Sequence, residues 1–344
     1  LLFSNLSKAQ KFDDYNDLWK EVQKFEVKSL PKSALKVVET IYEKAKKEEN
    51  STQITKALIY KSKFALTLEE DAQLNVINLF RSEISTTKTP TKNILESVLG
   101  NIYWQYFQQN RYKFYNRTKT SEKVDIADFR TWDLETLFNE VHIHFQNSLQ
   151  NGLILQQTNL ETFNDILHLQ KDSKKYRPTL FDFISHNALE FYKTSETSIT
   201  QASYKFEVDK NDFERFYKLQ NNYYRIQKDS LSLQLNALKI YQNLISFHDK
   251  TKNDNAFVLV EIERLQFLKQ QANFEGKNEL YLEKLIALKN EFNTHEASAL
   301  VGFEIAQVFN IEANAYIPIT STEHQFKNTE ALKICNSTID NFPE

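Results

Sequence analysis

Apolar side chains recur every three or four residues along most of the chain, with lysine and glutamate between them. The stretch 30–49 shows this pattern, and its apolar positions fall on one side of the expected helix: Ala34, Leu35, Val38, Ile41, Tyr42 and Ala45. Pro31 suits the first turn, because the N–H that it lacks would have no partner there. Asn50 and Ser51 break the pattern and offer a cap for a second helix, QITKALIYKSKFAL. Two helices joined by a short polar turn predict an α-helical hairpin.

The same hairpin pattern returns in the second half of the chain. The segment 231–247 is followed by the polar turn HDKTKNDN and by a second periodic segment, AFVLVEIERLQFLKQQ. The segments YLEKLIALKNEF and ASALVGFEIAQVFNIEANAY predict another pair of helices. Further helices are predicted at 15–25, 69–84, 93–110, 134–150, 160–169 and 179–192.

Ala-Leu-Lys stands near the start of a predicted helix at three places, Ala34, Ala237 and Ala331. A small alanine there lets the paired helix approach closely, and the larger residues behind it fill the groove between pairs. The separations between the three sites share no short period. We therefore expect an all-α protein, an irregular solenoid of α-helical hairpins that is similar to tetratricopeptide repeats.

A polar stretch at 194–212 separates the predicted helices into two groups. Within it, ITQASYKFEVD alternates enough to suggest a short extended segment or hairpin near 198–209. We predict an N-terminal helical lobe at 1–193, this polar connection, and helical repeats at 213–344.

The two ends of the chain suggest a piece of a longer protein. The chain begins at Leu1 without an initiator methionine, which indicates processing or truncation. The segment TEALKICNSTIDNFP begins a last repeat that is predicted to be incomplete. We therefore expect the apolar face of the helix 331–342 to be open and to cause self-association.

Composition excludes several classes of protein. Only four of the 344 residues are glycine, so neither a P-loop nor a dinucleotide-binding fingerprint can be assembled. The 43 basic and 46 acidic side chains are dispersed and give a net charge of −3, which indicates neither a nucleic acid nor an anionic membrane as a partner. No apolar run approaches the roughly 20 residues of a membrane-spanning helix.

The histidines give few candidates for metal binding or acid–base chemistry. Asp182 and His186 lie four residues apart on a predicted helix, a spacing that suits half of a metal site or an acid–base pair. No second half-site accompanies them, so a surface or capping contact is the favoured interpretation. His142 and His144 are two apart and point in different directions on a helix, so they cannot chelate one metal ion. The remaining histidines lack companions of the ligand type: His168, His248, His295 and His324.

No nucleophile stands out either. The chain contains no G-x-S-x-G elbow, and its single cysteine, Cys335, lies on an apolar helix face. One cysteine also excludes an internal disulfide framework and a cysteine-rich zinc site. We therefore predict no enzyme activity and no catalytic, cofactor-binding or metal-binding residues, and we expect no cofactor.

One stretch combines basic and aromatic side chains. In NRYKFYNRTKTSEK, Tyr112, Phe114 and Tyr115 are interleaved with five cations, as in proteins that bind single-stranded nucleic acid: Arg111, Lys113, Arg117, Lys119 and Lys123. Cations also suit the C-terminal end of a helix, and the overall charge is balanced. We therefore predict no nucleic-acid partner. The many aromatic residues could line a peptide groove, but core packing is the favoured interpretation.

Several segments, in this order, resemble the N-terminal helical region of bacterial alpha-2-macroglobulin-like proteins. They extend from about Tyr15 to Pro343, and the generic Ala-Leu-Lys helices are the least specific of them. The most specific parts are NRYKFYNRT, the segment around Trp132 and the run YRPTLFDF. The segments are YNDLWKEVQKFEVKSLPKSALKVVETIYEKAKKEEN, QITKALIYKSKF, LEED, ILESVLGNIYWQYFQQNRYKFYNRT, DIADFRTWDLETLF, YRPTLFDFISHNALEFY, LSLQLNALKIYQNLISFH and EALKICNSTIDNFP.

This resemblance implies a large envelope or periplasmic protein, similar to the macroglobulin protease inhibitors of animals. In that family a protease cuts an exposed bait segment and is trapped when the inhibitor rearranges. Many members also carry a reactive thioester in the motif C-x-E-Q. Cys335 is followed by Asn336, Ser337 and Thr338 and does not match it, so no functional residue of the family carries over.

The resemblance thus implies a non-enzymatic helical scaffold or interaction region. Its expected partners are the rest of the same polypeptide, envelope proteins or proteases, and its expected location is the cell envelope, periplasmic or surface-anchored. The alternative is a free-standing adaptor of tetratricopeptide type that binds a peptide or a surface glycan. A helical hydrolase with a dispersed site is a third class, which the missing nucleophile and metal constellations disfavour.

Overall fold

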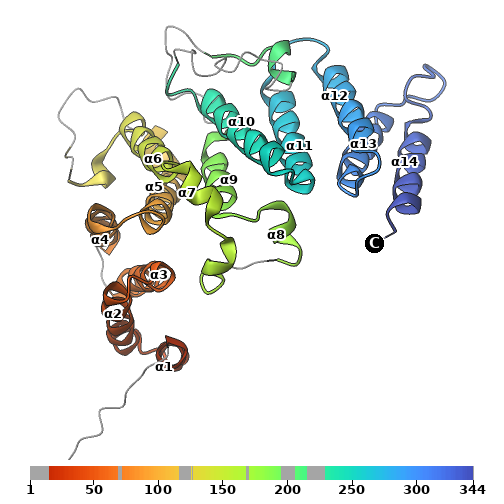
Figure 1. Ribbon diagram of the computed structural model, residues 1–344. Coiled ribbons are helices and arrows are strands. Elements are labelled where there is room, and N and C mark those ends of the chain that lie inside the picture. The colour runs from red at the N-terminus through yellow and green to blue at the C-terminus, as the bar shows by residue number, and fades with distance from the viewer. Residues whose placement is uncertain are drawn as a thin grey trace, which may run out of the picture. The chain divides into compact units, whose positions relative to one another are not determined.

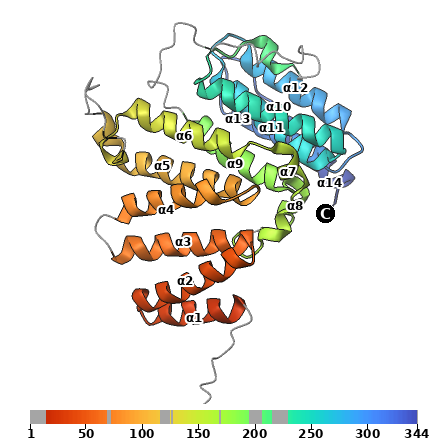
Figure 2. The same cartoon turned by 60° about the vertical axis from the view of Figure 1, so that its left-hand side comes forward.

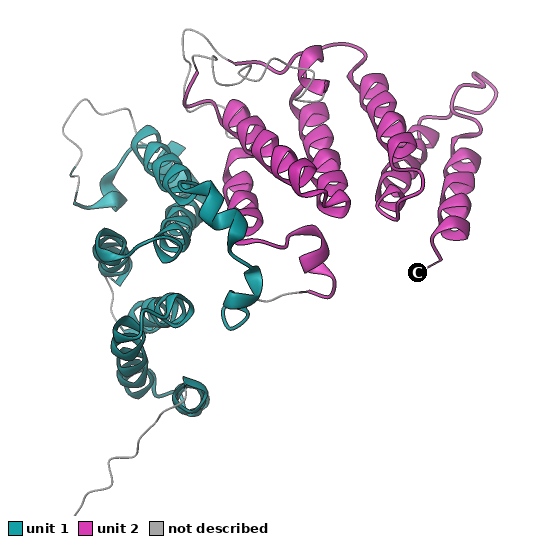
Figure 3. Ribbon diagram, in the orientation of Figure 1, with its two compact units in different colours: residues 1–169 teal, residues 170–344 magenta. Residues whose placement is uncertain are grey.

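The fold is known from a computed structural model, which describes residues 15–68, 72–115, 125, 127–167, 170–194, 206–214 and 229–343. Within these ranges the chain forms α-helices, labelled α1 to α14, and three short 3-10 helices, labelled η1 to η3 (Figure 1). None of these residues forms a β-strand, so the predicted all-α class is confirmed. The chain divides into two compact units, residues 1–169 and 170–344, which Figure 3 shows in different colours.

Unit 1 is a stack of helices in which each of α1 to α5 packs on the next helix of the chain (Figure 2). Its elements are α1 Tyr15–Val27, α2 Pro31–Lys47, α3 Ser51–Leu68, α4 Ala72–Thr86, α5 Thr91–Tyr115, η1 Phe129–Thr131, α6 Leu134–Ser148, α7 Gly152–Gln157 and η2 Leu160–Phe163. The predicted cap between α2 and α3 is present, because Asn50 Oδ1 accepts a hydrogen bond from the backbone N–H of Gln53 at 3.1 Å.

Unit 2 also brings chain neighbours together, with α9 on α10, α10 on α11, α11 on α12, α12 on α13 and α13 on α14. In addition, α11 contacts α13. The elements are α8 Ser173–Tyr176, α9 Leu180–Tyr192, η3 Lys210–Phe213, α10 Leu233–Thr251, α11 Asp254–Gln271, α12 Lys277–Glu291, α13 Ser298–Ala313 and α14 Lys327–Asn341. The boundary between the units thus lies before α9, whereas the sequence suggested a polar connection after it, at 194–212.

The recurring alanines occupy the positions that the sequence predicted. Ala34 and Ala237 have no exposed area, and Ala331 is buried with 9% exposed. Aromatic residues of unit 1 fill the space between α5 and α6, where Trp104 meets Phe138 edge-on with ring centroids 5.7 Å apart. Tyr103 stacks on Trp132 at 5.8 Å. For these four aromatic residues the core interpretation is confirmed, since each is at most 6% exposed.

Two local predictions differ from the structure. The predicted helix at 160–169 is wrong beyond Phe163, where turns follow η2 up to residue 167, and 168–169 lie outside the described residues. Tertiary contacts explain this, because the carbonyl of Thr162 accepts from the hydroxyl of Thr52 at 2.7 Å and Asp165 accepts from Gln53 at 2.9 Å. A helical pattern read from local spacing does not account for such distant partners.

The predicted extended segment near 198–209 is described only from residue 206. Residues 206–209 are irregular and form neither a strand nor a hairpin. The backbone N–H of Phe206 donates to the side chain of Asp229 at 3.1 Å, a role that a neighbouring strand would otherwise fill.

Two helical glycines should respond differently to alanine. A Cβ at Gly302 would lie 2.8 Å from Thr338 Oγ1 on α14, whereas one at Gly100 would meet its nearest atoms at 3.4 Å. Alanine improves helix propensity by roughly 1 kcal/mol. We therefore expect Gly100→Ala to leave the free energy of unfolding equal or higher, and Gly302→Ala to lower it by about 1 kcal/mol. Urea unfolding followed by circular dichroism measures both, and a stabilised Gly302→Ala would contradict the close approach of α13 and α14.

Candidate functional site

Asp182 is fully buried at the start of α9 and uses both carboxylate oxygens. Its Oδ2 accepts from the N–H of Thr179 at 3.0 Å and from the Thr179 hydroxyl at 2.7 Å, which completes a capping box. Its Oδ1 lies 2.7 Å from Nε2 of His248, in the last turn of α10, and neither side chain has any exposed area. The capping interpretation of Asp182 is confirmed, and this residue also joins α9 to α10.

His186 does not share a ligand position with Asp182. Its Nδ1 lies 2.7 Å from the backbone carbonyl of Asp182, and its Nε2 lies 3.1 Å from Oε2 of Glu263 on α11. Both ring nitrogens are therefore engaged. Arg177 donates to Oε1 of Glu263 at 2.9 Å. We call these five residues, Arg177, Asp182, His186, His248 and Glu263, the α9–α11 cluster.

The pKa of Glu263 reflects the positively charged side chains around it in the α9–α11 cluster. Burial raises the pKa of Glu263, but the hydrogen bond from His186 and the charges of His186, Arg177 and Lys193 lower it. The net result is a pKa below the ordinary value, so the carboxylate stays charged although it is mostly buried.

Ser185 lies beside this cluster and has to be considered as a nucleophile, because Asp182 and His248 already form a hydrogen-bonded acid–imidazole pair. A Ser–His–Asp arrangement requires a hydrogen bond between the serine hydroxyl and the free imidazole nitrogen. Ser185 Oγ and His248 Nδ1 both lack a hydrogen-bond partner, so they do not bond to each other. Ser185 is fully buried and His248 is 1% exposed. No nucleophile is presented to a substrate here.

A second buried group was missed by the sequence analysis. Arg264 has no exposed area, and its Nε and Nη2 donate to the two carboxylate oxygens of Glu261 at 2.9 and 2.7 Å. Its Nη1 donates to the backbone carbonyl of Asp212 at 2.6 Å, so it ties α11 to η3. The signal was present in AFVLVEIERLQFLK, where Glu261, Glu263 and Arg264 interrupt a largely apolar run that ends at Lys269. In such a run a charged pair has to be buried together.

Unit 1 contains a similar group between α4, α5 and α6, which we call the α5–α6 cluster: Arg81, Glu96, Glu140 and His144. His144 Nδ1 lies 2.6 Å from Glu96 Oε2, and its Nε2 lies 3.4 Å from Glu140 Oε1. Arg81 donates to the same Glu140 oxygen at 2.8 Å. The His144 ring stacks on Tyr103 at 5.6 Å. His142 is only half-buried, which fits the prediction that these two histidines point in different directions.

The pKa of His144 reflects this environment. Burial lowers it, but the hydrogen bonds and charges of Glu140 and Glu96 outweigh burial and raise the net pKa above 6.5. The pKa of Glu140 is lowered, mainly by its close pairing with His144 at 3.4 Å and with help from Arg81. The stabilisation from His144 is therefore complete below pH 6.5 and is lost as the pH rises through the folded-state pKa. The stabilisation from Glu140 is present above pH 4.5 and is lost as the pH falls through the folded-state pKa of Glu140.

We expect the α5–α6 cluster to contribute most to stability between pH 4.5 and 6.5. His144→Gln should lower the free energy of unfolding more at about pH 6 than at about pH 9, because the lost charge pairing matters only where His144 is protonated. Urea unfolding at the two pH values measures this, and His142→Gln on the same helix is the matched control. An equal loss at both pH values would contradict the assignment.

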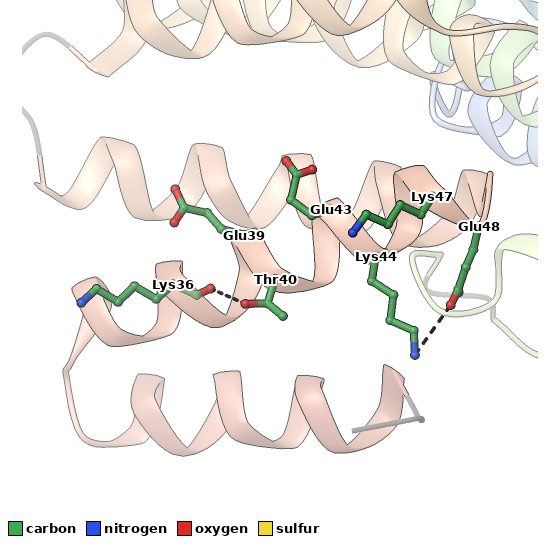
Figure 4. A pocket seen from close by; sticks show the side chains of 7 residues that line it. All are labelled: Lys36, Glu39, Thr40, Glu43, Lys44, Lys47 and Glu48. Carbon is green, nitrogen blue, oxygen red and sulfur yellow. Dashed lines mark hydrogen bonds and ion pairs between the residues drawn. The ribbon is translucent and has the colours of Figure 1, made fainter. Parts of the chain in front are cut away.

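Two hollows in the described part of the surface lie away from these groups. One of about 660 Å³ lies along α2, and its lining carries charges of both signs (Figure 4): Lys36, Glu39, Thr40, Glu43, Lys44, Lys47 and Glu48. Another, of about 330 Å³, lies where residues 207–210 meet α10 and the end of α11. There Gln234 donates to Gln271 at 2.7 Å, and Lys210 lies over the ring of Phe274. No residue of either cluster and neither Arg264 nor Glu261 lines these two hollows.

The basic and aromatic stretch is only partly described. Asn110 departs from helical geometry, and beyond it Phe114 is buried while Tyr112 is 86% exposed. Arg111 lies over the ring of Phe107. Lys113 is exposed, and three of the five cations of the stretch lie outside the described residues: Arg117, Lys119 and Lys123.

The remaining histidines and the cysteine that the sequence analysis considered do not belong to either cluster. His295 accepts from the backbone N–H of Ala297 at 3.1 Å, and His324 lies 3.5 Å from Glu323. Cys335 is half-exposed on α14, and His168 lies outside the described residues. In the described part of the chain, no group of three or more histidine, cysteine or acidic side chains could hold a metal ion. None of the described helices combines the length and the apolar character needed to cross a bilayer.

Comparison with known proteins gives no relative. No family model, no curated protein and no solved structure matches the chain. A proposal about function therefore rests on the geometry of the buried groups and on the segments of the sequence itself.

Proposed function

We propose that this chain is a non-enzymatic helical scaffold or interaction region, arranged as a solenoid of helical hairpins similar to tetratricopeptide repeats. One observation carries the proposal: the buried charged and imidazole side chains of the described residues bond to partners within the protein, and none of them lines either of the two described hollows. Asp182 and His248 join α9 to α10, and Arg264 joins α11 to η3. Catalytic groups have to reach a substrate, whereas groups that fix helix packing are best sealed from water.

The packing order supports the solenoid arrangement. In unit 2 each helix from α9 onwards contacts the next, and α11 contacts both α12 and α13. This is the pattern expected when the second helix of one hairpin packs against the following hairpin. Such an array presents long helical faces on which other proteins can bind.

The wider setting that we propose is an envelope protein of the alpha-2-macroglobulin-like type. Its support is the ordered resemblance of the segments from Tyr15 to Pro343. In that setting the scaffold would hold or present the inhibitor body, and its first partner would be the rest of the same polypeptide.

Two experiments test these proposals separately. The DNA that follows the codon for Glu344 should continue in frame into macroglobulin domains with a bait segment; an immediate stop codon would refute the alpha-2-macroglobulin setting. The purified chain should hydrolyse no ester, peptide, phosphate or glycoside in a broad screen with and without chelator. Turnover that disappears in His248→Asn, while the variant stays folded, would refute the non-enzymatic assignment.

A further inference from the structure

The helices α13 and α14 expose large apolar side chains on one side of their pair. Phe303 is 60% exposed, Leu332 60% and Ile339 61%. Asn310 lies seven residues after Phe303, on the same face of α13, and donates to Asn328 of α14 at 3.2 Å. Leu332 follows Asn328 by four residues, and Ile339 follows Leu332 by seven. The hydrogen bond therefore places these three apolar residues on one side of the pair, which we call the α13–α14 face.

Elsewhere in unit 2, a pair of neighbouring helices is covered by a third helix. The pair α12 and α13 is contacted by α11, which packs on both helices. On α14, only Ala331 is buried. Among the described residues no helix covers the α13–α14 face in the way that α11 covers α12 and α13. An exposed apolar stripe of this kind marks an interaction surface.

The spacing along α14 makes the α13–α14 face complementary to itself. Leu332 and Ile339 lie three residues before and four residues after Cys335, so a twofold axis next to Cys335 sets Leu332 of one copy against Ile339 of another. The two helices then run antiparallel. In this arrangement Lys333 of each copy lies on the same flank as Asp340 of the other. Both side chains are exposed, and neither makes an ion pair within the described residues.

We propose that the α13–α14 face binds a second copy of this chain, with the two α14 helices antiparallel about a twofold axis beside Cys335. The apolar contact of Leu332 with Ile339 supplies the affinity, and the pairing of Lys333 with Asp340 sets the direction. This interaction goes beyond the proposed scaffold function and does not depend on it, since it requires only the described face.

Sedimentation equilibrium of the 344-residue chain tests the proposal. Because one short helical face is a small interface, we expect a weak dimer, visible over about 5 to 300 µM as a mass rising from 40.6 kDa toward twice that value. Leu332→Lys should weaken association at least about tenfold. The matched control is Leu153→Lys on α7, a more exposed leucine (76%) far along the chain, which should change nothing.

Reversing the charges of Lys333 and Asp340 distinguishes this specific dimer from nonspecific hydrophobic association. Lys333→Asp alone and Asp340→Lys alone should each weaken the dimer roughly tenfold, because the twofold axis repeats the repulsion. The double variant Lys333→Asp/Asp340→Lys should restore wild-type association. Circular dichroism confirms that each variant stays folded.

Cys335 gives an independent measurement, because it is the only cysteine in the chain. A short bismaleimide should link two copies, and Cys335→Ser or Leu332→Lys should abolish the product. A monomer over the whole concentration range would overturn the proposal, and so would association that Leu332→Lys leaves intact. Dimers that the double charge reversal fails to restore would overturn the antiparallel arrangement.

Discussion

Replacing Arg264 by alanine is expected to destabilise unit 2 by about 3–5 kcal/mol. The substitution removes the two hydrogen bonds that Arg264 donates to Glu261, whose side chain is 4% exposed, and takes the cation away from that buried carboxylate. It also removes the donor to the carbonyl of Asp212, through which α11 holds η3. An uncompensated buried charge is among the few single changes that take away a large share of a domain's stability.

Urea unfolding followed by circular dichroism measures the effect of Arg264→Ala, and two further variants define its origin. Lys20→Ala breaks the ion pair with Asp17, which has the same i,i+3 spacing but is exposed, and should cost less than about 1 kcal/mol. The double variant Arg264→Met/Glu261→Leu removes both charges and should recover most of the loss. If Arg264→Ala lost no more than Lys20→Ala, the assignment of a structural buried pair would be wrong.

Asp182→Ala should have an effect of similar size, about 3–5 kcal/mol, because the carboxylate has two structural roles. It caps the N-terminus of α9 through Thr179, and it is the partner of the buried His248 on α10. Thr179→Ala removes only the cap contact from the hydroxyl and should cost about 1 kcal/mol. The difference between these two variants reports the contact between α9 and α10 together with the hydrogen bond from the Thr179 backbone N–H to Asp182.

The same unfolding measurement separates the two roles of Asp182 when it is repeated on His248→Asn and on the double variant Asp182→Ala/His248→Asn. If Asp182 and His248 act as one contact, the loss in the double variant should be smaller than the sum of the two single losses. Additive losses would mean that the 2.7 Å contact contributes nothing to stability.

The positions of the helices were predictable from the sequence because they depend on local spacing. The period of α2, the cap at Asn50 and the buried starts at Ala34 and Ala237 all follow from residues within one or two turns. The short η2 was not predictable in this way, since Thr52 and Gln53 hold it from more than 100 residues away.

The buried clusters were harder to predict than the helices for the same reason. Asp182 and His186 stood out because they are neighbours in sequence, but their actual partners are His248, 66 residues later, and Glu263, 77 residues later. Periodicity assigns charged residues to the exposed side of a helix, so Arg264 was overlooked. Its pairing with Glu261 three residues earlier is the local signal that reveals it.

The central claim is that the pairs Asp182–His248 and Glu261–Arg264 are sealed inside the helical packing and hold a scaffold together. Labelling of the folded chain with diethyl pyrocarbonate, with each histidine quantified by mass spectrometry, tests this most directly. His248, which is 1% exposed, should react far more slowly than the half-exposed His295 and His324, and should become reactive only on unfolding. If His248 in the folded chain were modified as fast as His295, the pair with Asp182 would be open to solvent and the claim would fail.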